Sequence, residues 1–344
     1  MLLKTTNKMF ILITMLIALV VIACVSLTFG QIDISLKSAI GVLCHQWDLP
    51  FYADEFTQED MAVVWHIRVP RMLVGILVGA ALGMAGAVMQ GIFSNPLAEP
   101  GIIGVSAGAA TGAVVAIALG FTAQTMFAMP MMAFIGSILT VFITVFLAMK
   151  RGKIPVMTLL LAGVAVGMLM SALTSGMLTF MNEHKLHQYL FWIVGGLDYR
   201  RWEHVYIAAP FVISGVIIMM MLARHLNILA LGETEAKSVG MPVMAFRMGL
   251  LAVASMTTAA SVCVSGNIGF VGLIVPHMMR ILLGPDHRIL LPASALGGAI
   301  FLVTCDAIGR AVIAPSEIRV GIMTALLGAP YFLYLLRKMH KESF

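Results

Sequence analysis

The stretch RVPRMLVGILVGAALGMAGAVMQGIFSNPLAEPGIIGVSAGAATG, residues 68–112, decides the fold. It has two apolar arms separated by a short polar turn at 94–100, which contains two prolines, an asparagine and a glutamate. Glycines recur every four residues, at 75, 79 and 83 in the first arm and at 104, 108 and 112 in the second. This spacing puts small residues on one helix face, where backbones approach closely in membranes. The stretch predicts two membrane helices, with the turn at a membrane surface or against a polar cavity.

The composition of the whole chain indicates a membrane protein. Of the 344 residues, 60% are hydrophobic and 11% are charged, whereas soluble domains carry about 25% charged residues. The net charge of +5 indicates basic residues on the inner membrane face rather than a surface that binds nucleic acid. Three of the four cysteines lie in apolar runs, so no disulfide framework is predicted.

Ten apolar segments are predicted to cross about 30 Å of hydrocarbon. They cover residues 9–29, 70–92, 98–119, 126–149, 156–180, 204–223, 243–265, 268–284, 289–313 and 318–336. The first run is too long for the apolar part of a cleaved signal peptide. We therefore expect an all-α integral membrane protein whose single transmembrane domain covers 1–344. An outer loop at about 30–67 is long enough for one or two surface helices, and an inner loop lies at about 224–242.

The distribution of charge predicts the orientation. With the amino terminus inside, ten spans place most basic loop residues inside and most acidic ones outside, as the positive-inside rule requires. Both termini are then cytoplasmic. The basic residues assigned to the inner side are Lys150, Arg151, Lys153, Arg224, Lys237, Arg288, Arg337, Lys338 and Lys341. The acidic residues assigned to the outer side are Asp33, Asp48, Asp54, Glu55, Glu59, Asp60, Glu183, Asp198, Glu203 and Glu317.

Two groups of residues could contact partner proteins. In the inner loop, Leu226, Leu229 and Leu231 recur at helical spacing, which favours a docking surface for another protein. Gly232 and Gly240 break the short amphipathic helices expected there. On the outer side, arginines could anchor the chain at the membrane interface or, as a set, receive carboxylates from a partner; they are Arg68, Arg71, Arg200, Arg201, Arg310 and Arg319. Asp306 and Arg310 are spaced i,i+4 and could instead neutralise each other.

Other polar residues leave their roles open. His184 and His187, beside Glu183, could form a metal pair, but no third ligand is evident, and a solvated loop is the favoured interpretation. His277 and Arg280 could line a pathway or anchor a helix end. The 28 methionines fit flexible packing between helices. The sequence contains neither a G-x-x-x-x-G-K-[ST] motif nor a hydrolase motif, so we expect no enzyme activity and no cofactor in this chain.

Several segments resemble the permease subunits of type II ABC importers, the iron-siderophore, haem and vitamin B12 permease family. They are RVPR (68–71), GAVMQGIFSNPLAEPGIIGVSAGA (86–109), LLLAGVAVG (159–167), LALGETEAKSVG (229–240), GFVGLIVPHMMR (269–280), DHRILLPASALGGA (286–299) and GAPYFLYLL (328–336). The resemblance implies ten helices in each of two permease subunits, which form a homodimer or a pair of close relatives. It also implies two cytoplasmic subunits that bind ATP and magnesium, an extracytoplasmic substrate-binding protein, and a bacterial cytoplasmic membrane.

The resemblance also assigns roles to individual residues. Arg68, Arg71 and Arg310 correspond to arginines that meet glutamates of the binding protein. The segment 232–240 resembles the coupling helices that contact the ATPase, and the residues expected to contribute are Leu229, Gly232, Glu233, Ala236 and Gly240. Asn95 and Leu97 resemble a cytoplasmic gate. A second gate pair, polar in the vitamin B12 permease, falls on the apolar Val156 and Met157.

We therefore expect an importer permease that moves an iron chelate, either a ferric siderophore or haem, by alternating access. Vitamin B12 is the alternative substrate, and the apolar second gate pair argues against it. An ion-coupled secondary carrier, which works without ATP, is the alternative from a different class.

Overall fold

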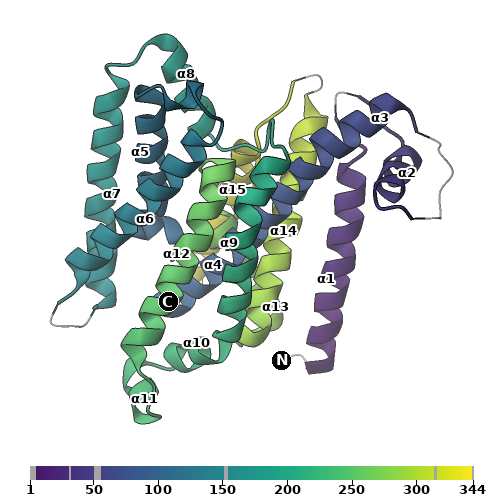
Figure 1. Cartoon of the computed structure of the whole chain (residues 1–344). Coiled ribbons are helices and arrows are strands. Elements are labelled where there is room, and N and C mark those ends of the chain that lie inside the picture. Colours follow the sequence, from purple (N-terminus) through teal and green to yellow (C-terminus); the bar gives the residue numbers. More distant parts are fainter. Residues whose placement is uncertain (1–4, 31, 50–55, 151–153, 314–315, 343–344) are drawn as a thin grey trace.

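The computed structural model describes residues 5–30, 32–49, 56–150, 154–313 and 316–342, and within these ranges the regular structure is helical (Figure 1). The helices are α1 Thr5–Ser26, α2 Leu36–Gln46, α3 Gln58–Val63, η1 Val64–Arg68, α4 Val69–Phe93, η2 Pro100–Ile103, α5 Val105–Ala118, η3 Phe121–Ala123, α6 Ala128–Ala148, α7 Val156–Leu178, α8 Glu183–Ile193, α9 Trp202–Met221, α10 Ala223–Ala230, α11 Glu233–Ser238, α12 Val243–Ser265, α13 Val271–Leu283, α14 His287–Val312 and α15 Val320–Glu342.

The predicted number of spans is confirmed. In the part of the chain that the structure describes, seven helical segments are long and apolar enough to cross a membrane, and three shorter apolar helices accompany them. The seven are α1, the continuous segment Gln58–Phe93, α6, α7, α9, α12 and α14; the shorter three are α5, α13 and the first part of α15. Together they match the ten predicted segments in order.

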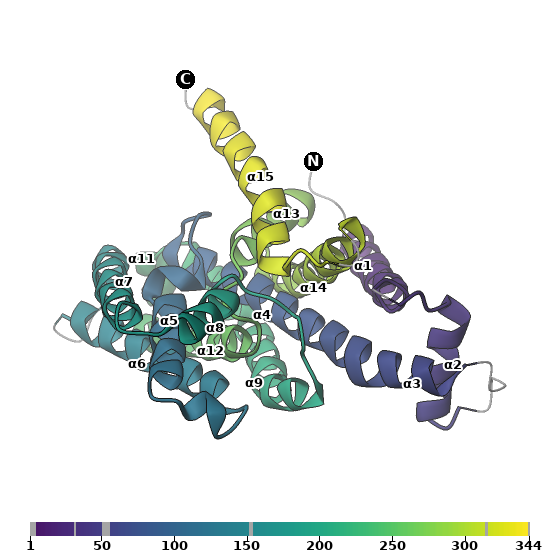
Figure 2. The same ribbon diagram turned by 90° about the horizontal axis from the view of Figure 1, so that it is seen from above.

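The two ends of the bundle differ (Figure 1). We call them the α3 end, where α2, α3 and α8 lie, and the α11 end, where α10, α11 and the start of α1 lie. The surface helices expected in the loop 30–67 are α2 and α3, which project to one side when the bundle is seen from above (Figure 2). Four of the charges used to predict orientation, Asp54, Glu55, Arg151 and Lys153, lie outside the described residues.

Helix α4 lies at the centre of the bundle and packs against α9, α12, α13 and α14. Its small residues allow these contacts. A Cβ atom on Gly86 would lie 1.9 Å from the carbonyl oxygen of Gly272 in α13, and one on Gly79 would lie 2.3 Å from the carbonyl oxygen of Gly298 in α14. The second arm uses Gly112 in the same way against Met132 of α6. The glycine faces therefore join each arm to a different set of helices.

The predicted span 98–119 begins too early. Helix α5 starts only at Val105, after a turn and the short 3-10 helix Pro100–Ile103. Pro100 lacks an N–H group, and Gly104 has a φ of 93°, a left-handed conformation that ends one helical segment before the next begins. Gly163 of α7 packs against the carbonyl oxygen of Ile102, so this irregular segment is covered by protein, as backbone at membrane depth requires.

A π-helical turn, Val64–Arg68, joins α3 to α4 without a break. Pro70 has no N–H to donate to the carbonyl group four residues earlier, and Val69 N–H bonds to Val64 O, five residues back. Such π-turns often occur at functional sites. This turn fixes the direction in which Arg68 and Arg71 leave the helix.

Candidate docking surfaces and pathway gate

A cavity of about 620 Å³ opens at the α3 end of the bundle. We call it the basic pocket; its charged lining residues are Arg68, Arg71, Arg200, Arg201, Arg310, Arg319, Asp198 and Glu317. These residues come from η1, α4, α14, the turn before α15 and the loop between α8 and α9. All six arginines predicted on the outer side therefore gather around one pocket.

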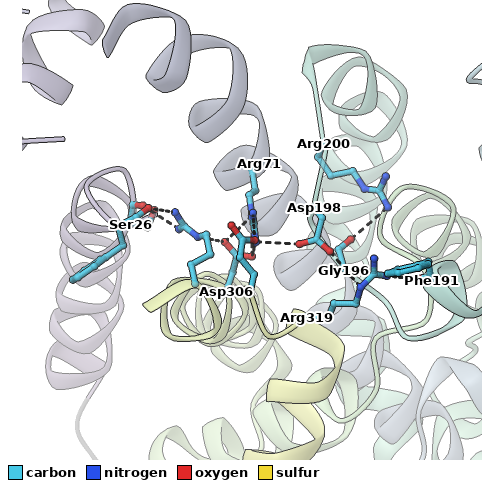
Figure 3. Close-up of polar contacts among 11 residues, drawn as sticks. Ser26, Arg71, Phe191, Gly196, Asp198, Arg200, Asp306 and Arg319 are labelled. Carbon is cyan, nitrogen blue, oxygen red and sulfur yellow. Dashed lines mark hydrogen bonds and ion pairs between the residues drawn. The ribbon is translucent and has the colours of Figure 1, made fainter. Parts of the chain in front are cut away.

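Arg71 is the centre of a charge network that joins three segments (Figure 3). Its Nη2 donates to Asp306 Oδ1 at 2.8 Å, and its Nε lies 3.1 and 3.2 Å from the two Asp306 oxygens. Its Nη1 donates to Glu317 Oε2 at 2.8 Å, and Nη2 also contacts Asp198 Oδ1 at 3.3 Å. The network ties α4 to three other segments: α14, the turn before α15 and the α8–α9 loop.

Arg310 shares the carboxylate of Asp306. Its Nε donates to Asp306 Oδ2 at 3.1 Å, so the predicted i,i+4 pair is formed. Its terminal nitrogens donate to the carbonyl oxygens of Ser26, at 3.0 Å, and Phe29. The guanidinium group thereby holds the end of α1 against α14.

Arg68 holds the chain that follows α1. Its Nη1 donates to Leu27 O at 2.6 Å, and Nη2 donates to Ile32 O. Backbone carbonyl groups beyond the end of a helix lack intrahelical partners, and a cation there also interacts favourably with the helix dipole.

The three arginines predicted to dock a binding protein lie together but are largely covered. Their exposed fractions are 6%, 8% and 6% for Arg68, Arg71 and Arg310. Of the carboxylates and carbonyl groups of the same chain that pair with them, the sequence indicated only Asp306 as a partner of Arg310. The exposed residues of the pocket lining include Arg201 and Tyr199, the latter 88% exposed and in a left-handed conformation with a φ of 57°.

Arg200 and Arg319 complete the pocket. Arg319 contacts Asp198 Oδ2 at 3.5 Å and lies over the ring of Phe191, with Cζ 4.3 Å from the ring centroid. Arg200 donates to Gly196 O at 3.4 Å, and its buried Nε has no partner within the described residues. Burial lowers the pKa of Arg200 to about 10, so the side chain stays charged at neutral pH. A buried cation with an unused donor favours an additional acceptor.

At the α11 end, the predicted inner loop forms α10 and α11. Leu226 and Leu229 are buried, 0% and 7% exposed, because α10 packs against α4 and α14 of the same chain. The helical spacing was thus correct, but packing within the chain accounts for these two leucines. Leu231, 71% exposed, and Val239, 67% exposed, are the apolar side chains that remain available to a partner.

The other residues predicted to contact the ATPase lie on α11 or flank it. Ala236 is buried, whereas Glu233 is exposed and bonds to Lys237 Nζ at 2.6 Å and to Arg247 of α12 at 3.3 Å. The hydrogen bond from Lys237 is the main cause that lowers the pKa of Glu233. Gly232 and Gly240 have φ values of 127° and 79°, so both break the helices as predicted.

Helix α10 is fixed to the start of α14 by a polar cluster. Asn227 donates to Asp286 Oδ1 at 2.7 Å and accepts from the backbone N–H of His287 at 2.8 Å. Asp286 also pairs with Arg288 at 2.7 Å. The hydrogen bonds from Arg288 and Asn227 lower the pKa of Asp286, with Arg288 the larger cause.

The four predicted gate residues lie on two adjoining segments. Asn95 and Leu97 form a turn after α4, in which Leu97 N–H donates to Asn95 Oδ1 at 2.9 Å. Val156 and Met157 begin α7, which packs on the 3-10 turn that follows Leu97. Asn95, Leu97 and Val156 are half-buried, and Met157 is 68% exposed.

The histidine pair lies on the surface. His184 and His187 are exposed on α8, and His187 Nε2 lies 3.8 Å from Glu183 Oε1. No group of three or more histidine, cysteine, aspartate or glutamate side chains suited to a metal ion occurs among the described residues.

Known proteins are similar to this chain in sequence and fold. Residues 17–338 match the model of the FecCD transport family. The cobalamin import system permease protein of Halobacterium salinarum is 47% identical over 80% of this chain and 73% of its own length. The hemin transport system permease protein of Yersinia pestis is 37% identical over 95% of both chains. A solved structure, described as a metal-chelate type ABC transporter in an inward-facing conformation, is 32% identical, with a TM-score of 0.84 over 95% of this chain and 99% of the other.

These likenesses cover nearly all of the bundle, including both candidate docking surfaces and the gate. They describe transport permeases rather than ATPases or ion-coupled carriers. The chain therefore belongs to the FecCD transport family and is a multi-pass membrane permease of the ABC importer type.

Proposed function

We propose that this permease moves a large metal chelate across the cytoplasmic membrane of a bacterium by alternating access, driven by ATP hydrolysis on a separate subunit. The chain lacks a phosphate-binding loop motif, so a partner must bind the nucleotide and its magnesium. The chain itself supplies a pathway, a gate and two surfaces for partners. Helices that re-pack as rigid bodies can open such a pathway to one side at a time.

The substrate we favour is an iron chelate, either a ferric siderophore or haem. The relative named as a hemin permease matches the chain along almost its whole length. Cobalamin is the second candidate, because a relative named as a cobalamin permease is 47% identical. The second gate pair, polar in the vitamin B12 permease, is the apolar Val156 and Met157 here, which would make this part of the pathway less polar.

The α11 end is assigned to the cytoplasm. Basic residues near it include Lys8, Lys150, Arg224 and Lys237, whereas most of the acidic loop residues lie at the α3 end. Because basic residues are retained on the cytoplasmic side of membranes, both termini are then cytoplasmic. The six arginines at the α3 end do not contradict this assignment, since carboxylates and carbonyl groups of the chain pair with most of them.

The basic pocket is the proposed docking site for a substrate-binding protein. Its lining holds six arginines and two carboxylates, so a partner that presents carboxylates matches its charge. Arg201 and Tyr199 are exposed in this pocket, and arginine and tyrosine are among the residue types that contribute most binding energy at protein interfaces. Carboxylates of the partner would reach Arg68, Arg71 and Arg310 by competing with the internal acceptors.

The α10–α11 surface is the proposed seat of the ATPase subunit. Leu231 and Val239 would supply its exposed apolar contacts, with Glu233 and Lys237 beside them. Leu229, Gly232, Ala236 and Gly240 would instead hold the shape of this surface. A second permease subunit, identical or closely related, would complete the pathway, because the exposed gate residue Met157 lies on the edge helix α7.

The experiment that tests this function measures ATP hydrolysis by the purified complex in nanodiscs. The permease is purified with its ATPase, and hydrolysis is compared with and without the binding protein loaded with a ferric siderophore, haemin or cyanocobalamin. Stimulation by one iron chelate is expected. Stimulation by cyanocobalamin alone would establish the second candidate, and equal rates under all conditions would contradict the proposed coupling.

A further inference from the structure

The two helices of the proposed ATPase seat are attached to the bundle in different ways. Asn227 joins α10 to α14 through short contacts, 2.7 Å to Asp286 and 2.8 Å to His287. Leu226 and Leu229 are buried behind it. Helix α10 is therefore held firmly by both polar and apolar contacts.

Helix α11 has a looser attachment through Arg247 of α12. The Nη1 and Nη2 atoms of Arg247 each lie 3.3 Å from Glu233 Oε2, and Nη1 lies 3.5 Å from the carbonyl oxygen of Ile154. All three contacts are at the long end of hydrogen-bond distances. The buried Nε of Arg247 has no partner in the described part of the chain.

The contact with Ile154 connects α11 to the gate. Ile154 is followed by Pro155 and then by α7, which begins with the predicted gate residues Val156 and Met157. Arg247 thus contacts both α11 and Ile154, which lies two residues before the start of α7. A cavity of about 720 Å³ lies among these elements, lined by Ile154, Pro155, Glu233 and Arg247 together with methionines of the α11–α12 segment. The cavity leaves room for α11 to move toward Ile154 and Pro155, the residues that precede α7.

Gly232 is a pivot between α10, which is held firmly, and α11, which has the looser attachment. Gly232, between α10 and α11, has a φ of 127°, and a Cβ atom there would lie 2.2 Å from Glu235 Oε2. Glycine adopts this backbone conformation without the steric cost that other residues meet. Rotation about this residue would move α11 while α10 stays fixed to α14.

We propose that Arg247 is a positioning residue that transmits the displacement of α11 to the start of α7, and so couples ATP hydrolysis to the gate. This inference rests on the proposed function, in which the ATPase contacts α10 and α11. On this account, Arg247 follows Glu233 when α11 moves and pulls or releases the backbone at Ile154.

The test separates ATP hydrolysis from movement of α7. A spin label is placed at Leu161, which is exposed one turn beyond Met157, in a cysteine-free version of the chain. The labelled permease is assembled with its ATPase and binding protein in nanodiscs. The variants are Arg247→Met, which removes the bridge, and Arg247→Lys, which keeps the charge. Lys150→Met is the matched control, because it removes an exposed cation from the same end of the bundle, outside α10, α11 and α7.

The wild-type label should change its spectrum when ATP and vanadate are added. In Arg247→Met the spectrum of the label should no longer change, although ATP is still hydrolysed. Uptake of haemin or cyanocobalamin per ATP hydrolysed should fall about tenfold, because a hydrogen bond to a charged group contributes about 1.5 kcal/mol or more. Arg247→Lys should restore part of the response, and Lys150→Met should match wild type.

A label in Arg247→Met that responds as in wild type would overturn the inference, as would an equal loss in Lys150→Met. Co-purification of the ATPase is measured first. Its failure with the unmodified chain would instead overturn the proposed function, so the two outcomes are distinguishable.

Discussion

Replacing Asp306 by asparagine should destabilise the protein by about 3 kcal/mol. Asp306 is 4% exposed and pairs with both Arg71 and Arg310. Removing one partner of a buried ion pair costs about 3–5 kcal/mol, because the remaining charge stays buried without compensation. The lower end of that range applies here, since Arg71 keeps Glu317 at 2.8 Å and Arg310 keeps two carbonyl oxygens.

The assay for Asp306→Asn is the free energy of unfolding, measured by SDS titration in mixed micelles. Glu317→Gln is the matched control. It alters a single 2.8 Å contact of a side chain that is 23% exposed, so its expected cost is about 1 kcal/mol. Equal stability of Asp306→Asn and wild type would refute the view that this network holds the α3 end together.

Three further predictions concern packing, pH and partners. Gly86→Ala should cost about 2 kcal/mol in the same unfolding assay, because its Cβ would meet the backbone of α13. Gly249→Ala, with open space around it, should be neutral or stabilising. Equal costs would contradict the close packing of α4 on α13. Hydrogen bonds from Arg288 and Asn227 lower the pKa of Asp286 in the folded protein. The ionised carboxylate therefore stabilises the fold at pH values above the usual carboxyl pKa, and this stabilisation is lost as the pH falls through the lowered pKa. The stability difference between wild type and Asp286→Asn should therefore shrink below about pH 4 in unfolding titrations, and a difference independent of pH would exclude this effect. Leu231→Glu should detach the ATPase in co-purification and Arg201→Glu should weaken stimulation by the binding protein, while retention of both properties would remove these residues from the docking surfaces.

The helical architecture was predictable because membrane spans are encoded locally, as apolar runs of sufficient length. The boundary error at α5 has a local cause as well. The polar turn does not end at Pro100, since Gly104 adopts a left-handed conformation before the helix begins. Hydropathy alone counts residues 98–104 as part of a span, because glycine and isoleucine are apolar whatever their backbone conformation.

The charge network at the α3 end could be predicted only in part. The pair of Asp306 and Arg310 was visible, because i,i+4 spacing on a helix brings side chains together. Asp198 and Glu317 lie 127 and 246 residues from Arg71 in the sequence, and only the packed bundle brings them to it. The same holds for Leu226 and Leu229, whose spacing was interpreted as a docking surface for another protein, whereas α4 and α14 of the same chain bury them.

The most direct test of the central claim is substrate uptake into proteoliposomes that contain the permease with its ATPase. ATP is enclosed in the lumen on the side of the α11 end, and the binding protein with haemin, a ferric siderophore or cyanocobalamin is added outside. We predict uptake that requires both ATP and the binding protein and that persists when an ionophore collapses all ion gradients. Uptake that proceeds without ATP and stops with the ionophore would contradict the account.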